Sequence, residues 1–261
     1  MRRLMLVSLV VLGWAAMVPG QVESSASASA SSRGPVRVAI GTFVFAPGDK
    51  LALEIGREEP CPCLCDEIQV QAFQVLGPEG ELVFEDTATA YPVAAGEWTG
   101  RWHLADTSGQ PVPPGDYTAV ARTSLGELQA QLRVADPEER LAGRTMARAS
   151  MCGISLHVYR LVDEEDEGAR LWLQVGESLM VALPGNPTTG YEWEVEGEPA
   201  FLALVPGVEY RADSGLLGAG GVFYFRYRAE EAGEGQLTFA YRRPWEAAPP
   251  ERTFAVTVVV R

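Results

Sequence analysis

Residues 185–191 read Gly-Asn-Pro-Thr-Thr-Gly-Tyr and lie between two apolar runs. Asn-Pro starts a turn, because the ring of Pro187 fixes its own φ at about −65° and disfavours the α region for Asn186. Gly190 can then adopt a positive φ on the far side of two small threonines. A loop bent at both ends loses little conformational entropy on docking, so this pattern suits insertion into another molecule's cleft. By itself, the pattern is also compatible with an ordinary turn.

Two further segments, residues 218–221 and 243–245, read Gly-Ala-Gly-Gly and Arg-Pro-Trp and adjoin predicted strands. Trp245 is suited to anchor a contact, because a rigid aromatic ring buries a large area and its truncation costs about 2 kcal/mol or more. Pro244 stiffens its loop, whereas the glycines leave the other segment pliable. The alternative interpretations are an ordinary glycine loop, a surface tryptophan and, for Arg243, a charge that braces the loop without contacting a partner.

The strands that would carry these segments follow from apolar alternation in the C-terminal part of the chain. They are predicted at residues 154–162, 171–175, 178–183, 192–195, 222–228, 235–241 and 253–260. Phe223, Phe225 and Tyr227, for example, share one face and are expected in a core. We find no helical pattern of ordinary length, so residues 151–261 are predicted to form a β-sandwich.

Short strands are also predicted at residues 36–40, 51–55, 68–75 and 81–84, with turn signals between them. The most patterned stretch, residues 98–117, has the form W-x-G…D-x-x-G-x-x-V-P-x-G-x-Y and resembles bacterial immunoglobulin-like modules of the hook-capping and proteinase-inhibitor types. Either Trp98 or Trp102 is expected in its core. The predicted fold class is therefore all-β. Two immunoglobulin-like antiparallel β-sandwich domains, at residues 36–135 and 151–261, are joined by a connector at residues 136–150.

The N-terminus has the order of a secretory signal. Arg2 and Arg3 precede an apolar run that ends near residue 18 and is followed by small residues. We expect residues 1–20 to be a signal peptide and the Ser/Ala-rich residues 21–35 to be a flexible linker. An uncleaved membrane anchor is less favoured, because a spanning helix needs about 20 apolar residues and this apolar run is shorter. The mature protein is expected to be exported (secreted, periplasmic or on the cell surface), with no membrane association after cleavage.

The chain has four cysteines, Cys61, Cys63, Cys65 and Cys152. In an exported chain they favour disulfides, and one bridge from the cluster to Cys152 would tie the two domains together. The remaining pair would close a short, strained loop, so mixed or free thiols are an alternative. A copper or zinc site is a further alternative, but C-x-C-x-C lacks the usual C-x₂-C spacing, and we predict no metal.

Composition and charge exclude several classes of function. The 261-residue chain has a formal net charge of −14, whereas a phosphate-binding surface needs an excess of Lys and Arg. We therefore expect no nucleic-acid partner, and we expect the acidic run at residues 163–167 to be solvated. An enzyme is not favoured, since His103 and His157 fall in strand regions of different domains without a nearby nucleophile and orienting carboxylate. The sequence has no phosphate-binding loop or dinucleotide fingerprint, and no cofactor is expected.

The three loop motifs occur in one order: N-P-T-T-G-[YF], then G-x-G-G before a strand, then R-P-[WF] after one. In this order and at these separations they resemble the chagasin family of cysteine protease inhibitors, over about residues 151–261. The resemblance implies an immunoglobulin-like sandwich whose three loops gather at one end as a wedge for a papain-like cysteine protease. It implies protease-binding residues at Asn186, Pro187, Thr188, Thr189, Gly190, Tyr191, Gly218, Ala219, Gly220, Gly221, Arg243, Pro244 and Trp245.

The sequence thus predicts a reversible proteinaceous inhibitor that acts as a monomer and occludes the cleft of its target protease. The competing hypothesis is an exported, non-inhibitory immunoglobulin-like protein that acts in binding or cell-surface assembly. The first domain lies outside the resemblance, and we expect it to be a spacer or an accessory element.

Overall fold

The structure, a computed structural model, describes residues 43–46, 48–57, 69–86, 91–92, 98–124, 126–135, 148–151, 154–212 and 218–261. Strands dominate these residues and the helical elements are two short 3₁₀ turns, so the all-β prediction is confirmed. The predicted signal peptide, the linker and the four cysteines (Cys61, Cys63, Cys65 and Cys152) lie outside the described residues. Within those residues, no helix is long and apolar enough to cross a membrane.

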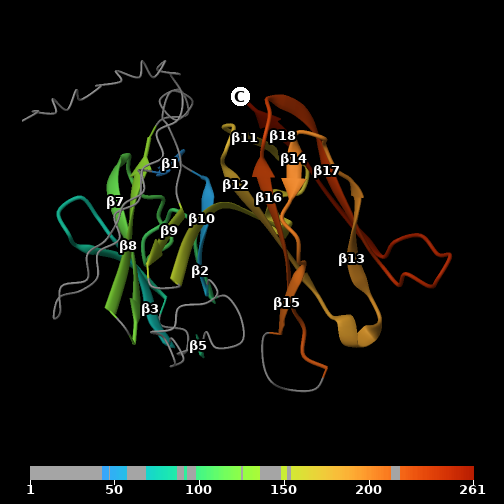
Figure 1. Cartoon of the computed structure of the whole chain (residues 1–261), viewed down its shortest axis with the longest axis horizontal. Helices are drawn as coiled ribbons and strands as arrows, with labels where there is room; N and C mark the ends of the chain where they lie inside the picture. Colours follow the sequence, from blue (N-terminus) through green and yellow to red (C-terminus); the bar gives the residue numbers. More distant parts are fainter. Residues whose placement is uncertain are drawn as a thin grey trace, which may run out of the picture.

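The described strands form three sheets (Figure 1). The first sheet has the order β1 (Phe43–Phe45), β8 (Gly126–Val134), β7 (Gly115–Thr123), β3 (Gln69–Leu76) and β4 (Leu82–Asp86), with β5 (Tyr91–Pro92) also on β3. The central sheet has the order β14 (Leu202–Leu204), β16 (Gly221–Ala229), β12 (Ser178–Gly185), β10 (Ile154–Asp163), β2 (Lys50–Arg57) and β6 (Trp98–Trp102), with β15 (Glu209–Ala212) on β16 and β9 (Arg148–Met151) on β10. The third sheet has the order β11 (Arg170–Leu173), β18 (Arg252–Val260), β17 (Gly233–Arg242) and β13 (Glu192–Gly197).

Most pairs among the described strands are antiparallel, and three are parallel: β1 with β8, β10 with β12, and β11 with β18. The first 3₁₀ turn, η1 (Glu164–Asp166), follows β10 directly. The second, η2 (Pro187–Thr189), lies between β12 and β13. The observed strands contain or overlap those predicted from alternation within the described residues. The short edge strands β14 and β15 were not predicted.

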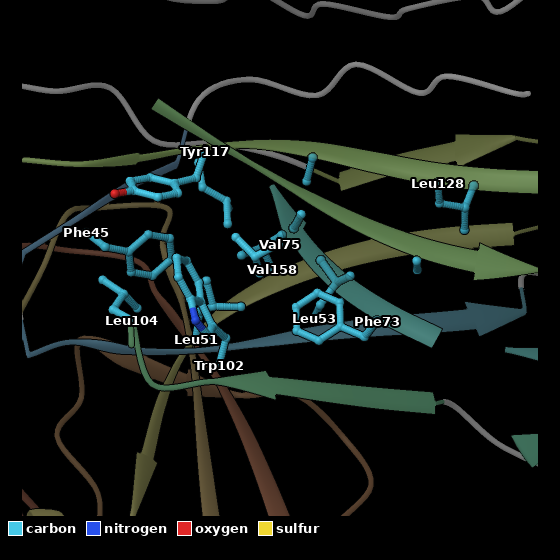
Figure 2. Packing of buried hydrophobic residues seen from close by; sticks show 14 of the residues in the cluster. Phe45, Leu51, Leu53, Phe73, Val75, Trp102, Leu104, Tyr117, Leu128 and Val158 are labelled. Atoms are coloured by element: carbon cyan, nitrogen blue, oxygen red, sulfur yellow. The ribbon is translucent and has the colours of Figure 1, made fainter. Parts of the chain in front are cut away.

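The first sheet packs on one end of the central sheet and encloses the first core. This core includes Phe45, Leu51, Leu53, Phe73, Val75, Trp102, Leu104, Tyr117, Leu128 and Val158 (Figure 2). Trp102 is 1% exposed and its ring lies 5.8 Å from that of Tyr117, which confirms the expectation that a tryptophan of this segment fills the core. The alternation along residues 51–55 that predicted β2 thus corresponds to side chains that point into this core: Leu51, Leu53 and Ile55.

The third sheet packs on the other end of the central sheet and encloses the second core. Three aromatic rings lie at its centre: Phe239 of β17 is 4.8 Å from Phe225 of β16 and 6.2 Å from Phe254 of β18, measured between centroids. All three side chains are at most 2% exposed. Two sandwiches therefore share one central sheet, and the second sandwich carries the three predicted recognition loops.

β10 belongs to both sandwiches. Its Val158 lies in the first core and its Val162 in the second. The strand pairs with β2 in antiparallel fashion and with β12 in parallel fashion. The last part of the predicted connector forms β9, which pairs with β10. Backbone hydrogen bonding is thus continuous from the first sandwich to the second.

Lys50 adds an ionic link between the two parts. Its Nζ donates to Asp163 Oδ1 at 2.6 Å and lies 3.1 Å from Glu165 Oε2 and 3.2 Å from Asp166 Oδ2. Burial lowers the pKa of Lys50, but the hydrogen bonds to Asp163 and Glu165 outweigh burial and raise the pKa above its ordinary value. The expectation of a solvated acidic loop is therefore wrong for Asp163, which is buried and whose carboxylate pairs with the chain's single lysine.

Candidate functional site

Loop 1, residues 185–191, connects β12 to β13 and contains η2. Asn186 caps this turn: its Oδ1 accepts hydrogen bonds from Thr188 N at 3.1 Å and from Thr188 Oγ1 at 2.6 Å. Thr189 Oγ1 donates to the Asn186 carbonyl at 2.6 Å, and Gly190 ends the turn with φ of 83°. The predicted roles of Pro187 and Gly190 are confirmed, because the proline opens the turn and the glycine takes the left-handed conformation. The two threonines are exposed at the tip.

Asn186 also connects loop 1 to the rest of the site. Its Nδ2 donates to the Gly218 carbonyl at 2.9 Å, which joins loop 1 to loop 2, residues 218–221. Its backbone N–H donates to the Tyr241 hydroxyl at 2.7 Å, at the end of β17. One side chain thus closes its own turn and fixes the position of a second loop.

Loop 2 is held from below by β15. The hydroxyl of Tyr210 donates to the Ala219 carbonyl at 3.3 Å. Gly221 has no space for a side chain, since a Cβ there would lie 2.1 Å from the Arg211 carbonyl oxygen. Gly218 has a φ of 83° but faces open space. Glycine is therefore needed at these two positions for different reasons: the close approach of the backbone at Gly221 and the left-handed conformation at Gly218.

Loop 3, residues 243–251, connects β17 to β18. Arg243 Nε donates to the Thr189 carbonyl at 3.2 Å, and its guanidinium lies 4.6 Å from the centroid of the Tyr191 ring. Its Nη1 also donates to Glu246 Oε1 at 2.8 Å, and this hydrogen bond raises the pKa of Arg243. Arg243 therefore braces loop 3 against loop 1.

Trp245 is the most exposed large apolar side chain among the described residues, at 69% exposure. One edge of its ring rests on loop 1, because a Cβ on Gly190 would lie only 2.6 Å from Trp245 Cη2. The indole is therefore positioned by loop 1 while most of its surface stays free.

An aromatic and cationic layer supports the three loops. Tyr241 stacks with Tyr191 at 5.3 Å and packs on Trp193 at 5.1 Å, both measured between centroids. The guanidinium of Arg252 lies 4.3 Å from the Tyr241 centroid and donates to the Pro184 carbonyl at 2.9 Å. Burial, together with a hydrogen bond to Glu251, raises the pKa of Tyr191.

An open concavity of about 530 Å³ lies above this layer. Its lining includes Pro184, Gly185, Asn186, Thr189, Tyr191, Gly220, Tyr241, Arg243, Glu251 and Arg252. Tyr241 and Arg252 were not predicted as site residues. The alternation along residues 235–241 assigned Tyr241 to the core alone, although its hydroxyl reaches loop 1. A tyrosine at the last inward position of a strand, next to a loop motif, is the signal that could have identified it.

The two histidines lie away from these loops in the sequence and have other neighbours. His157 of β10 has Nδ1 3.4 Å from the Tyr159 hydroxyl. His103 follows β6 and has Nε2 3.9 Å from Asp163 Oδ2. In the parts of the chain that are described, no group of three or more His, Cys, Asp or Glu side chains could hold a metal ion. The three loops form an exposed surface whose parts are joined by hydrogen bonds from Asn186 and Arg243.

Comparison with known proteins identifies relatives of this part of the chain. A family model described as "Chagasin family peptidase inhibitor I42" matches residues 173–258. Amoebiasin-1 of Entamoeba histolytica is 36% identical over 101 residues, which are 38% of this chain and 96% of that protein. Chagasin of Trypanosoma cruzi is 38% identical over 89 residues, which are 32% of this chain and 81% of that protein.

Among solved structures, a cysteine protease inhibitor from Entamoeba histolytica is 26% identical, with a TM-score of 0.36, and the match covers 39% of this chain and 94% of the other. The sequence matches extend over most of each relative, and the residues that the family model matches include all three loops, so the resemblance drawn from the loop motifs is confirmed. Through its second sandwich, this chain belongs to the chagasin family of peptidase inhibitors.

Proposed function

We propose that this protein is a reversible inhibitor of papain-like cysteine proteases and that loops 1, 2 and 3 occlude the active-site cleft. Membership of a family of peptidase inhibitors supports this proposal, as does the description of one solved relative as a cysteine protease inhibitor. In this proposal, the residues that contact the protease are those predicted from the sequence: Asn186, Pro187, Thr188, Thr189, Gly190, Tyr191, Gly218, Ala219, Gly220, Gly221, Arg243, Pro244 and Trp245.

The chemistry of loop 1 fits a blocking role without covalent reaction. A papain-like cleft holds a thiolate of low pKa beside a histidine, and it attacks a carbonyl only when the peptide is suitably oriented. In loop 1 the backbone is folded into a turn, with Thr189 N donating to Asn186 O at 3.2 Å and Gly190 N donating to Pro187 O at 2.9 Å. Thr188 and Thr189 can therefore approach the thiolate while their peptide bonds are held in a compact turn.

The observation that carries the proposal is that the loops are bonded to one another and still display Trp245. Asn186 joins loop 1 to loop 2, and Arg243 joins loop 3 to loop 1. Because these bonds form before any partner arrives, docking orders few additional side chains. An interface of about 1,600 Å² in total would then support nanomolar binding, with Trp245 as its anchor.

The test is a titration of papain with the purified full chain, followed by a fluorogenic peptide substrate. We expect papain activity to fall to zero near stoichiometric addition and to return on extensive dilution. Trypsin, a serine protease, is the control and should keep its activity. If correctly folded protein at about 10 µM leaves papain fully active, the proposal is wrong and the non-inhibitory exported binding protein becomes the better hypothesis.

We also propose that the mature protein is an exported monomer without enzymatic activity or cofactor. The support for export is the order of charged, apolar and small residues at positions 1–20. N-terminal sequencing of the protein recovered outside the cytoplasm should start near Gln21. Recovery in the cytoplasm with Met1 intact would contradict export.

A further inference from the structure

The two outer sheets pack on the same face of the central sheet, and no sheet formed by the described residues covers its other face. Leu53 of β2 and Val181 of β12 point into the first and second cores, so the alternate residues of these strands point away from both. The side chains on that opposite face are nevertheless buried, at 4% exposure or less: Ala52, Tyr159, Leu161, Met180, Ala182 and Tyr224. We call this cluster the inner seam.

The inner seam is buried because the central sheet is strongly curved. β6 and β16 are four strand spacings apart in the sheet, which would separate them by about 19 Å if the sheet were flat. Yet Arg101 Nη2 of β6 donates to the Tyr224 hydroxyl of β16 at 2.7 Å, and its guanidinium lies 5.5 Å from the Tyr224 ring centroid. The face that carries the inner seam is thus concave, and the first sandwich meets the second across it.

Charged residues cross the same face. Glu54 of β2 is 2% exposed, and its carboxylate accepts from Nε of Arg226 of β16 at 3.0 Å. Arg226 is 5% exposed and donates through Nη2 to Glu209 Oε2 of β15 at 2.6 Å. Glu209 also accepts from Arg211 Nε at 2.5 Å. Burial raises the pKa of Glu209, but hydrogen bonds from Arg211 and Arg226 outweigh burial and lower the pKa.

The last strand in this network leads directly to loop 2. β15 pairs with the start of β16, from Glu209 opposite Tyr224 to Ala212 opposite Gly221. On one face of β15, Glu209 and Arg211 bind the charge network, and the Arg211 guanidinium lies 5.2 Å from the Tyr224 ring centroid. On the other face, Tyr210 donates to the Ala219 carbonyl of loop 2. A short edge strand is thus anchored by the first sandwich and in turn anchors loop 2.

We propose that Glu54 and Arg101 of the first sandwich are positioning residues for loop 2. They hold β15 and the start of β16, and through them they set the place of loop 2 beside Asn186 of loop 1. The first sandwich thereby preorganises the inhibitory surface through its own side chains. Of the two roles that we expected from the sequence, a spacer or an accessory element, this proposal favours the accessory element, and it rests on the proposed function of the three loops.

The physical consequence is a difference in entropy on docking. With the network intact, loop 2 is ordered before the protease arrives. Binding therefore loses no further conformational entropy in ordering this loop. When Glu54 is replaced, Arg226 stays buried with one carboxylate fewer, and β15 can separate from its neighbours more readily. A loosened loop 2 must then be ordered by the protease, which lowers affinity through faster dissociation.

The experiment compares Arg101→Met and Glu54→Gln with Arg122→Met in the full chain. Arg122 is a matched control, because it lies on β7 of the first sandwich and forms an exposed pair with Glu127. Amide hydrogen exchange of residues 209–212 and 218–221 reports loop 2 without any protease. We expect exchange there to be about tenfold faster in both network variants and unchanged in the control.

Dissociation of each variant from papain is the second readout. Arg101→Met is expected to dissociate about three- to tenfold faster and Glu54→Gln about tenfold faster or more, with the control within about twofold of the parent. Arg101→Lys, which keeps a donor for Tyr224, should recover part of the loss. In a double-mutant cycle, Tyr224→Phe should add little to Arg101→Met, because both remove the same hydrogen bond.

Three results would overturn the inference. Unchanged exchange in residues 209–212 and 218–221 would show that the first sandwich does not hold loop 2. Faster exchange with parental dissociation from papain would show that the position of loop 2 does not affect affinity. Equal losses in the Arg122→Met control would assign the effect to general destabilisation. If the parent protein does not bind papain at all, the proposed function fails, and the exchange measurement alone then decides whether Glu54 and Arg101 position loop 2.

Discussion

The two sandwiches end in loops that differ in whether they are bonded to other loops. The β6–β7 loop of the first sandwich is bonded mainly to itself: Asp106 Oδ1 accepts from Ser108 N and Gln110 N, at 2.8 and 2.9 Å, and Tyr117 donates to Pro113 O at 2.7 Å. The loops of the second sandwich are bonded to one another, through Asn186 and Arg243. A loop that closes on itself completes a fold, whereas loops bonded together can present one surface.

The tryptophans show the same difference. Trp102 is 1% exposed, and its Nε1 donates to the Ala105 carbonyl at 2.7 Å, so both its ring and its polar atom are used inside the first sandwich. Trp245 is 69% exposed and rests on Gly190 by one edge. One indole therefore stabilises the protein, and the other is available to a partner. The following variants test this contrast.

Of these variants, Trp102→Ala should have the largest effect, and this effect should be a loss of stability. Removing this ring from a packed core is expected to cost about 3–5 kcal/mol in the free energy of unfolding. Urea denaturation followed by circular dichroism measures this cost. Leu82→Ala on β4 is the control, because Leu82 is 50% exposed and its truncation should cost about 1 kcal/mol or less. Equal losses for the two variants would mean that Trp102 does not organise the first core.

Trp245→Ala should have the next largest effect, and this effect should be a loss of affinity for papain. We expect affinity for papain to fall by about 2 kcal/mol or more, close to thirtyfold, because an anchor aromatic is lost. The melting temperature should change by no more than about 1 °C, since the ring is largely solvated. Isothermal titration and a thermal melt measure the two quantities. A large loss of stability with unchanged affinity would assign Trp245 to the fold instead.

Gly190→Ala and Gly218→Ala form a matched pair. Both glycines have a φ of 83°, so each alanine should cost about 1–2 kcal/mol in backbone strain. At Gly190 the new Cβ would also meet the Trp245 ring, whereas at Gly218 it meets open space. We expect Gly190→Ala to quench or shift the Trp245 contribution to fluorescence and to weaken papain binding more than Gly218→Ala. Equal effects of the two variants on binding would mean that contact with loop 1 does not position Trp245.

Asp106→Asn should have the smallest effect, confined to acid pH. Hydrogen bonds from Ser108 and Gln110 lower the pKa of Asp106. Stability from the carboxylate is therefore present above its unfolded pKa of about 3.9 and is lost as the pH falls through the lower folded pKa. Melting temperatures from pH 7 to pH 2.5 should fall less steeply for Asp106→Asn than for the parent, with Ser108→Ala between them. Parallel curves for all three proteins would contradict this role.

Much of the fold follows from local sequence patterns. Alternation along residues 222–228, 235–241 and 253–260 predicts the strands of the second sandwich, because each side chain's environment repeats with the pleat. The turn chemistry of Pro187 and Gly190 is equally local, so the sequence alone predicts the bend of loop 1. The loop motifs were predictable for the same reason.

The features that join the two sandwiches were not predictable, because they depend on strand pairing across the chain. Nothing in residues 154–163 indicates that β10 pairs with β2 as well as with β12. Glu54 and Arg226 occupy the alternate positions that normally face solvent, and they are buried only because the central sheet curves. The hydroxyl of Tyr241 likewise belongs to the site because β17 places it where the backbone N–H of Asn186 donates to it.

The most direct test of the central claim is a comparison of binding to papain with an open cleft and papain whose cleft is filled by a covalent, peptide-like inhibitor on the active-site cysteine. Isothermal titration with the full chain gives Kd for both forms. Occlusion of the cleft by the bonded loops predicts nanomolar binding to the open enzyme and a Kd at least about 100-fold weaker for the filled one. Equal affinity for the two forms would contradict the account, because it would place the contact outside the cleft.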